Sequence, residues 1–258
     1  GTGYPEIQKI YPQEESQLAD VWSKYMPSDR YDCGNIDFCN DGDKLHSIKT
    51  LEDFMSEKIL LIDGHSILNR AFYGLPDLTN SEGKHTGAVY GFLNILFRTI
   101  EEEKPQYLTV AFDLKAPTFR HKMFEAYKGT RKPMPEELRE QVPLIKEMLT
   151  AMGVNVVTKE GYEADDILGT LARKSEAAGM DATILSGDRD LLQLATDKVM
   201  IRLPKTVRGK TTIEDYHAQQ VIEKYQVTPP QIIELKALMG DSADNIPGIP
   251  GVGEKTAT

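Results

Sequence analysis

Carboxylates gather in one stretch of the sequence, residues 161–190, which contains Glu163, Asp165, Asp166, Asp188 and Asp190. Like charges that crowd together repel and raise each other's pKa unless a cation offsets them. Hard divalent cations such as Mg²⁺ and Mn²⁺ prefer oxygen ligands, and the stretch contains no His or Cys. These residue types therefore indicate a metal site built from carboxylates.

Capping is the simpler alternative for part of this pattern. Asp and Glu are favoured in the first turn of any helix, because the unpaired backbone N–H groups and the helix dipole attract negative charge. Capping explains one or two of the first three acids. It does not explain Asp188 and Asp190, which follow the next apolar run.

The flanking patterns predict which elements position these acids. Apolar residues after Glu163 recur at three- and four-residue spacing, which predicts an amphipathic helix with its acids at the amino end. Residues 182–185 are a short apolar run stopped by Ser-Gly, which predicts a buried strand. The acids therefore lie where a helix begins and a strand ends, which is the ligand-binding edge of an open α/β sheet.

Two earlier apolar runs end in acids as well. Residues 59–62 precede Asp63, residues 108–112 precede Asp113, and each run is typical of a central parallel strand. For Asp63 alone, capping and function are equal alternatives. Strands alternating with helices predict a mostly parallel sheet covered on both faces. The other expected elements are helices at 86–103 and 136–152, a strand at 154–157, a short helix at 191–194, a hairpin at 199–213, and helices at 216–225 and 229–238.

A third acid pair precedes a loop rich in Gly and Pro. Asp241 and Asp244 are three residues apart, so both would face one direction in a turn of helix. Gly248, Gly251 and Gly253 would let the backbone approach a ligand closely, and exposed N–H groups between helices can hold a phosphate. Such a loop is usually only a turn, but its position directly after an acid pair favours a ligand.

Residues 115–139 have a different character, because basic residues alternate with Phe119, Phe124 and Tyr127. This pattern suits a nucleic-acid strand, since cations meet phosphates and rings stack on unpaired bases. A solvated, partly helical insertion with inward-packed aromatics is the open alternative. A small-molecule phosphohydrolase is the least favoured class, because it has no use for such a segment.

Composition is ordinary for a globular protein, with 40% hydrophobic and 27% charged residues among 258, and the net charge of −10 does not itself suggest a nucleic-acid partner. Residues 1–54 contain 11 acidic and 5 basic residues, both cysteines (Cys33 and Cys39) and no motif. We interpret them as a fused extension, an upstream translated segment or an accessory piece. No membrane span or signal peptide is recognised, which favours a cytoplasmic location and no membrane partner.

Taken together, the motifs closely resemble the 5′ nuclease (5′-3′ exonuclease) domain of bacterial DNA polymerase I, in the flap endonuclease family. The resemblance runs from about residue 56 to the last residue. It rests on these motifs: Ile62-Asp63-Gly64-His65, Phe112-Asp113, Phe119-Arg120, Tyr127-Lys128, Glu163-Ala164-Asp165-Asp166, Gly187-Asp188-Arg189-Asp190, residues 239–245 and residues 251–257.

The resemblance implies an α/β fold with a PIN-like, mostly parallel central sheet flanked by helices, a helical arch, and a C-terminal helix-hairpin-helix that this chain cuts short. The implied division is an extension at 1–54, a nuclease core at 55–213 that includes the arch at 115–139, and a helical DNA-binding region at 214–258. It also implies two Mg²⁺ or Mn²⁺ ions and a K⁺ ion at the hairpin.

The resemblance assigns roles to residues of this chain. The implied metal ligands are Asp63, Asp113, Glu163, Asp165, Asp166, Asp188, Asp190, Asp241 and Asp244. The implied DNA-binding residues are Arg120, Tyr127, Lys128, Arg131, Gly251, Gly253 and Lys255. Arg120 and Lys128 would also act in catalysis. We expect oxygens of Asp63, Asp113, Asp166 and Asp188 to converge within a few ångströms at one end of the sheet.

The implied activity is hydrolysis of DNA at a 5′ flap, nick or 5′ end, in replication and excision repair. The expected setting is the bacterial nucleoid, with a polymerase domain following in the full-length chain. Two alternatives stay open: a stand-alone 5′ nuclease paralogue, and a DNA-junction binding module that does not cleave.

Overall fold

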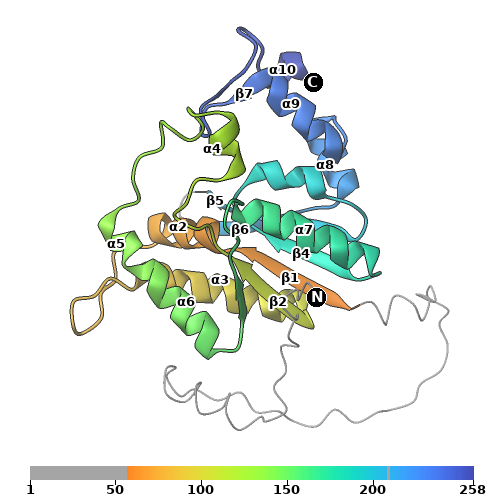
Figure 1. Cartoon of the computed structure of the whole chain (residues 1–258). Coiled ribbons are helices and arrows are strands. Elements are labelled where there is room, and N and C mark those ends of the chain that lie inside the picture. Colours follow the sequence, from red (N-terminus) through yellow and green to blue (C-terminus); the bar gives the residue numbers. More distant parts are fainter. Residues whose placement is uncertain (1–56, 208–209) are drawn as a thin grey trace, which may run out of the picture. The chain divides into compact units, whose positions relative to one another are not determined.

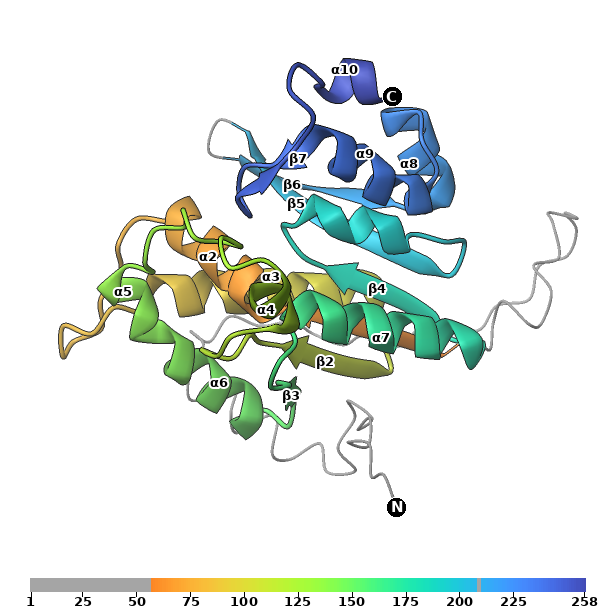
Figure 2. The same cartoon turned by 45° about the horizontal axis from the view of Figure 1, so that its top comes forward.

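The computed structural model describes residues 57–207 and 210–258, in which a central sheet is covered by helices on both faces (Figures 1 and 2). Its strands are β1 (Lys58–Asp63), β2 (Tyr107–Ala111), β3 (Asn155–Val157), β4 (Asp181–Leu185), β5 (Val199–Val207) and β6 (Lys210–Tyr216). Their order across the sheet is β3-β2-β1-β4-β5-β6. The first five strands in this order pair in parallel, and only β6 is antiparallel to its neighbour.

The central strand is apolar throughout because both of its faces are covered. Ile59, Leu60, Leu61 and Ile62 are completely buried, and alternate residues of β1 enter different cores. Leu61 pairs with Thr109 of β2 on one side and Ile184 of β4 on the other. This register brings the carboxyl ends of β1, β2 and β4 to the same edge of the sheet.

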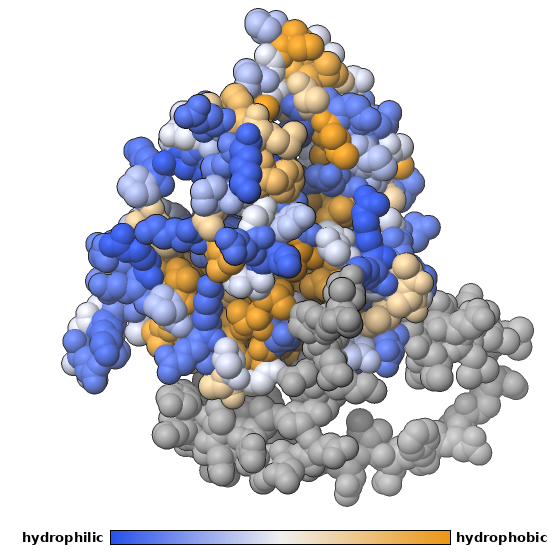
Figure 3. All heavy atoms as spheres, in the orientation of Figure 1, coloured by the Kyte–Doolittle hydropathy of each residue, from blue (hydrophilic) through white to orange (hydrophobic). Residues whose placement is uncertain are grey.

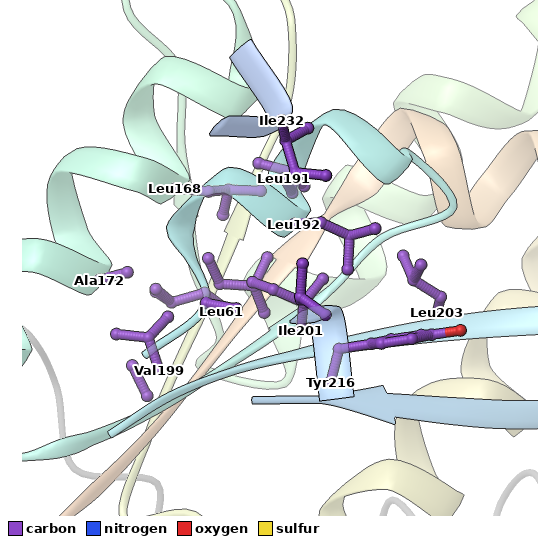
Figure 4. Packing of buried hydrophobic residues seen from close by; sticks show 14 of the residues in the cluster. Leu61, Leu168, Ala172, Leu191, Leu192, Val199, Ile201, Leu203, Tyr216 and Ile232 are labelled. Atoms are coloured by element: carbon purple, nitrogen blue, oxygen red, sulfur yellow. The ribbon is translucent and has the colours of Figure 1, made fainter. Parts of the chain in front are cut away.

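Helices divide between the two cores. The cores contain α2 (Gly64–Gly74), α3 (Gly87–Glu103) and α6 (Gln141–Ala151) on one face, and α7 (Ala164–Ala177), η1 (Arg189–Leu194), α8 (Ala218–Tyr225), η2 (Pro229–Gln231) and α9 (Ile232–Met239) on the other. Figure 4 shows the second core, where Leu168 of α7, Leu191 of η1 and Ile232 of α9 gather around Leu61 and Ile201.

The segment at residues 115–139 contains two short helices, α4 (Phe119–Met123) and α5 (Glu136–Arg139), joined by turns. It contacts the C-terminal part of the chain: Lys128 N–H donates to Asp244 O (2.9 Å), and Asn245 Nδ2 donates to Ala126 O (2.8 Å). Residues more than one hundred positions apart are thereby held together.

The C-terminal part forms a hairpin between helices. The two-residue strands β7 (Gly240–Asp241) and β8 (Ile246–Pro247) pair, and α10 (Glu254–Ala257) follows. The helical turn considered for residues 241–244 is therefore wrong, because Asp241 lies in a strand. Gly248 lets the chain approach the Met239 backbone closely: a Cβ there would lie 2.1 Å from it. Apolar surface appears at the top of Figure 3, near the loop that precedes α10 and contains the exposed Ile249.

Most expected elements are found, with three differences. The helix expected at 136–152 divides into α5 and α6 around Glu140, the short helix after Asp188 is a 3₁₀ helix, and the helix at 229–238 begins as the 3₁₀ turn η2. Cys33, Cys39 and the rest of residues 1–54 lie outside the described residues. No helix among the described residues is both long and apolar enough to cross a bilayer.

Candidate active site

Asp63 lies at the carboxyl end of β1, and its buried carboxylate has two roles. Oδ1 accepts the Ser66 N–H (3.0 Å) and so caps α2, while Oδ2 accepts the Ser186 hydroxyl (2.9 Å) from beyond β4. The capping alternative therefore holds for Asp63. It does not exclude a second role, because the side chain also faces the acids described next.

Asp113 and Asp188 follow the neighbouring strands. Asp113 Oδ1 accepts the Ala164 N–H at the start of α7 (2.7 Å), and the Asp113 N–H donates to His65 Nδ1 (3.2 Å). Burial lowers the pKa of His65 despite the nearby charge of Asp113, which keeps this imidazole neutral and able to accept. Asp188 Oδ1 accepts the Asp190 N–H (2.9 Å) and caps η1.

Asp165, in the first turn of α7, is the least satisfied of these acids. Its Oδ1 is shielded from solvent and has no hydrogen-bond partner among the described residues. Burial, together with the charges of Asp63, Asp188 and Asp113, raises the pKa of Asp165 to about 8. Burial, with Asp113 and Asp188, also raises the pKa of Asp63 to about 6. We call Asp63, Asp113, Asp165 and Asp188 the central carboxylates, because they repel one another without an offsetting cation.

Asp166, the fourth acid expected to converge, is paired with a cation. Its carboxylate accepts two hydrogen bonds from the Arg120 guanidinium, both 2.8 Å long, and a third from the Glu163 N–H. Burial raises the pKa of Asp166, but the bonds to Arg120 and the backbone outweigh it, and the pKa is lowered. Within the described residues, no three His, Cys, Asp or Glu side chains are arranged so that they could hold a metal ion as they lie.

Glu163 and Asp244 are turned toward the segment at residues 115–139. Glu163 accepts Lys128 Nζ (2.8 Å), and the Tyr127 hydroxyl lies 3.0 Å from both Glu163 Oε2 and Asp244 Oδ2. Because a hydroxyl has one proton, Tyr127 donates to only one of these carboxylates at a time. Arg131 forms an ion pair with Asp244. The structure thus brings four predicted DNA-binding residues, Arg120, Tyr127, Lys128 and Arg131, against predicted metal ligands.

Asp190 and Asp241 share one cation. Lys236 Nζ lies 2.8 Å from Asp190 Oδ1 and 2.8 Å from Asp241 Oδ2. Burial and the charge of Asp188 raise the pKa of Asp190 against the effect of Lys236, whereas Lys236 and backbone N–H groups outweigh burial and lower that of Asp241. We call Glu163, Asp166, Asp190, Asp241 and Asp244 the outer carboxylates, since each pairs with a cationic side chain of the protein.

The hairpin residues predicted to bind DNA lie on the exposed loop and helix after β8. Gly251 has φ +81°, a conformation that favours glycine, and a side chain there would meet nothing within 4 Å. Gly253 precedes α10 and its carbonyl accepts from Thr256 and Ala257 N–H. Lys255, in α10, is exposed. No contact joins these three residues to the central carboxylates.

Sequence analysis did not identify three further residues of this region. Ser186 fixes Asp63, Lys236 pairs with two outer carboxylates, and Tyr162 forms a half-exposed pair with Phe119, whose ring centroid lies 5.9 Å away. The Phe119 N–H donates to Gly161 O (3.0 Å), and the Arg120 guanidinium lies 4.5 Å from the centre of the Phe119 ring. Position next to a motif acid was the available signal for Tyr162 and Ser186.

Two family models match adjoining parts of the chain. The 5′-3′ exonuclease, N-terminal resolvase-like domain matches residues 58–226, and the 5′-3′ exonuclease, C-terminal SAM fold matches residues 227–258. The chain belongs to the 5′-3′ exonuclease family. This membership confirms the resemblance recognised in the sequence, and the observed sheet confirms the PIN-like, mostly parallel α/β fold.

Relatives in this family include two bacterial polymerases. DNA polymerase I of Bacillus subtilis (strain 168) is 53% identical over 201 residues, and that of Bacillus caldotenax is 51% identical over 203 residues. The first alignment covers 78% of this chain and the second 79%, but each covers 23% of the relative. The chain therefore spans about a quarter of the length of these relatives.

Solved structures of bacteriophage T5 nucleases have a similar fold. The bacteriophage T5 5′-exonuclease with bound zinc is 25% identical, with a TM-score of 0.62 over 78% of this chain and 73% of that one. A T5 flap endonuclease complex with DNA and metal ions is 24% identical, with a TM-score of 0.63 over the same shares. At the lower identity of the second structure, the likeness shows the fold alone.

Proposed function

We propose that this chain is a divalent-metal-dependent, structure-specific 5′ nuclease with 5′-3′ exonuclease and 5′-flap endonuclease activity, acting in DNA replication and repair. The proposal rests most directly on Asp165 Oδ1, a buried and unpartnered carboxylate oxygen surrounded by three other acids. Membership of the 5′-3′ exonuclease family supports it, as does the likeness to DNA polymerase I of Bacillus subtilis.

The central carboxylates suit a hard divalent cation. All four offer oxygen ligands. Burial and their mutual repulsion raise the pKa of Asp63 and Asp165, even though the charge of Lys128 acts against the rise at Asp165, which favours a bound cation. We infer that Asp63, Asp113, Asp165 and Asp188 hold Mg²⁺ or Mn²⁺, with the outer carboxylates completing the surroundings of two ions. Bound there, such ions would activate water and offset charge on the phosphodiester.

Arg120 and Lys128 are the residues we assign to transition-state stabilisation. Glu163 and Asp166 hold both cations beside the central carboxylates. Each cation therefore needs to move only a short distance to leave its carboxylate and bind the scissile phosphate. A guanidinium or ammonium so placed offsets negative charge that develops on the phosphate. Tyr127 and Arg131, anchored on Asp244, would direct the same strand.

The substrate we infer is DNA with a 5′ flap, a nick or a 5′ end. The exposed Phe119–Tyr162 pair suits an unpaired base, because any base can stack on an aromatic ring. Gly251, Gly253 and Lys255 would contact the duplex in the region 214–258, with a K⁺ ion at the hairpin, while residues 55–213 form the nuclease core. A polymerase region would follow in the full-length protein.

A labelled-flap assay tests the proposal. A DNA junction with a 5′-labelled flap is incubated with the protein in EDTA, Mg²⁺ or Mn²⁺, and the products are separated by size. We expect release of the flap only with the metal. A matched duplex without a junction, labelled at an internal position, serves as the control and should lose only nucleotides at its 5′ end.

The alternative is a junction-binding module that does not cleave. It is considered because Arg120 and Lys128, the cations assigned to the transition state, are both paired with carboxylates in this structure. Retention of the labelled junction in a gel shift, with no product at any Mg²⁺ concentration, would favour this module and exclude the nuclease. Sequence beyond residue 258 would separate a polymerase-fused enzyme from a stand-alone paralogue.

A further inference from the structure

Lys236 is a cation that the proposed chemistry does not use. It lies in α9, and its Nζ is 2.8 Å from Asp190 Oδ1 and 2.8 Å from Asp241 Oδ2. Its side chain and that of Asp190 are each 35% exposed, while that of Asp241 is 16% exposed. One ammonium therefore lies within ion-pair distance of two carboxylates. It donates a hydrogen bond to Asp241 Oδ2, whereas Asp190 Oδ1 is buried and has no hydrogen-bond partner among the described residues.

Backbone groups fix the Asp241 carboxylate and the main chain of Asp190, whose N–H donates to Asp188 Oδ1. Asp241 Oδ1 accepts the Ala243 N–H (2.8 Å), and Asp190 lies in η1, whose first turn Asp188 caps. A lysine ammonium is a compact charge on a flexible four-carbon stem. Lys236 can therefore withdraw toward solvent while Asp190 and Asp241 keep their positions.

The Asp190–Asp241 pair adjoins the central carboxylates. The Asp190 N–H donates to Asp188 Oδ1 (2.9 Å), so Asp190 lies next to a central carboxylate. The pair also joins two parts of the chain, because Asp190 belongs to the segment at 58–226 and Asp241 to that at 227–258. Without Lys236, two carboxylates on facing elements would repel each other across this boundary.

We propose that Lys236 is a built-in counter-ion that competes with a divalent cation for Asp190 and Asp241. In the metal-free protein it offsets one of the two negative charges of the pair and holds α9 against η1. A divalent ion can bind this pair only after Lys236 withdraws, so metal binding is ordered: the central carboxylates fill first and Asp190–Asp241 fills later and more weakly. This inference rests on the proposed metal dependence, but not on DNA cleavage.

Mn²⁺ counting by electron paramagnetic resonance tests the order of binding in the 258-residue chain. Free Mn²⁺ is titrated against wild type, Lys236→Met and Lys236→Arg. Wild type should bind one ion tightly and a second weakly. Because an opposite charge beside a carboxylate typically changes its proton affinity by one to three pKa units, Lys236→Met should tighten the second site about tenfold. Lys236→Arg should behave as wild type. An unchanged or weakened second site in Lys236→Met would overturn the proposal.

Thermal unfolding separates competition from a purely structural role. Lys236→Met should lower the melting temperature in EDTA. Saturating Mg²⁺ should then raise the melting temperature of this variant by more than it raises that of wild type. If Lys236 only packs α9, its replacement would lower the melting temperature equally with and without Mg²⁺. This result would contradict the proposal. Lys224→Met is the matched control, because Lys224 pairs with Glu214 (2.8 Å) on β6 and should leave the Mg²⁺ effect unchanged.

The outcome is independent of the nuclease assay. A protein that binds Mn²⁺ in the expected order but releases no labelled flap would support the role of Lys236 and contradict the proposed function. If the protein cleaves in Mg²⁺ and Lys236→Met leaves the Mn²⁺ affinity of the second site unchanged, the function would be supported and the role of Lys236 overturned.

Discussion

The two groups of acids differ in how their charge is balanced. The outer carboxylates pair with cationic side chains from the segment at 115–139 and from α9, and the pKa values of Asp166 and Asp241 fall below their usual range. Among the described residues, the central carboxylates form no salt bridge with Lys or Arg. The pKa values of Asp63 and Asp165 rise, and in the outer group only that of Asp190 does so as well. The difference indicates that the protein neutralises one group itself and leaves the other for a ligand.

Four experiments test this contrast, and the largest effect is expected at Asp165. In Asp165→Asn the side chain keeps its shape but loses the charge that its neighbours repel, so the metal-free protein should become more stable. Metal-dependent cleavage should fall at least about a thousandfold, because a bound metal contributes several kcal/mol of charge stabilisation. Melting curves in EDTA and a labelled-flap assay in Mg²⁺ measure the two effects. Asp197→Asn, an exposed acid before β5, should change neither.

Arg120 tests the outer group. Arg120→Ala removes the bidentate partner of Asp166 and a cation assigned to the phosphate, so the maximal rate of flap release should fall about a hundredfold. Arg120→Lys should recover only part of the rate, since a lysine cannot bind bidentately. The control is Arg98→Ala, which removes a surface ion pair with Glu102. Wild-type rates in Arg120→Ala would remove Arg120 from the catalytic residues.

Stability in EDTA should depend on pH through the central carboxylates. An acid whose pKa is higher in the folded state binds its proton more tightly there, so its stabilising contribution is full below the unfolded pKa of 3.8 and is lost as pH rises through the folded value. The window runs to about 6 for Asp63 and about 8 for Asp165. We expect the free energy of unfolding to fall by on the order of 5 kcal/mol between pH 5 and pH 8, because each pH unit inside a group's window costs about 1.4 kcal/mol.

Urea unfolding at several pH values measures this decline. Saturating Mg²⁺ should flatten it, because a bound cation removes the advantage of the protonated acids. A free energy of unfolding that is constant or rises with pH in EDTA would show that the central carboxylates do not repel one another in solution.

The smallest effect is expected at Tyr162. Tyr162→Ala removes one ring of the pair with Phe119, so affinity for a junction with an unpaired 5′ strand should fall about fivefold, near the lower end of the stacking energy of one base. Fluorescence anisotropy in EDTA measures binding without metal-dependent cleavage. Tyr73→Ala, which removes a ring that is 71% exposed on α2, should bind as wild type. Equal affinities for both variants would exclude stacking at this pair.

Local sequence predicted the elements that position the site. Residues 59–62 and 182–185 are apolar because both faces of a parallel strand are buried. The sequence alone therefore indicated that these segments are strands and that acids follow them. The break at Glu140 was not recognised, because residues 136–152 are suited to a helix throughout. The outcome there depends on packing against other elements rather than on propensity.

Side-chain pairings could not be predicted in the same way. Tyr127 reaches Asp244 across 117 positions, and Lys236 reaches Asp190 across the boundary between α9 and η1. Such contacts depend on how two elements meet in the folded chain. The division into central and outer carboxylates was therefore not visible in a sequence where all nine acids belong to similar motifs.

Anomalous diffraction from crystals grown with Mn²⁺ tests the central claim most directly. We expect the strongest anomalous peak to be surrounded by oxygens of Asp63, Asp165 and Asp188, with Asp165 Oδ1 among its ligands. Crystals in which Mn²⁺ binds only at other acids, and Asp165 Oδ1 stays without a partner, would contradict the account.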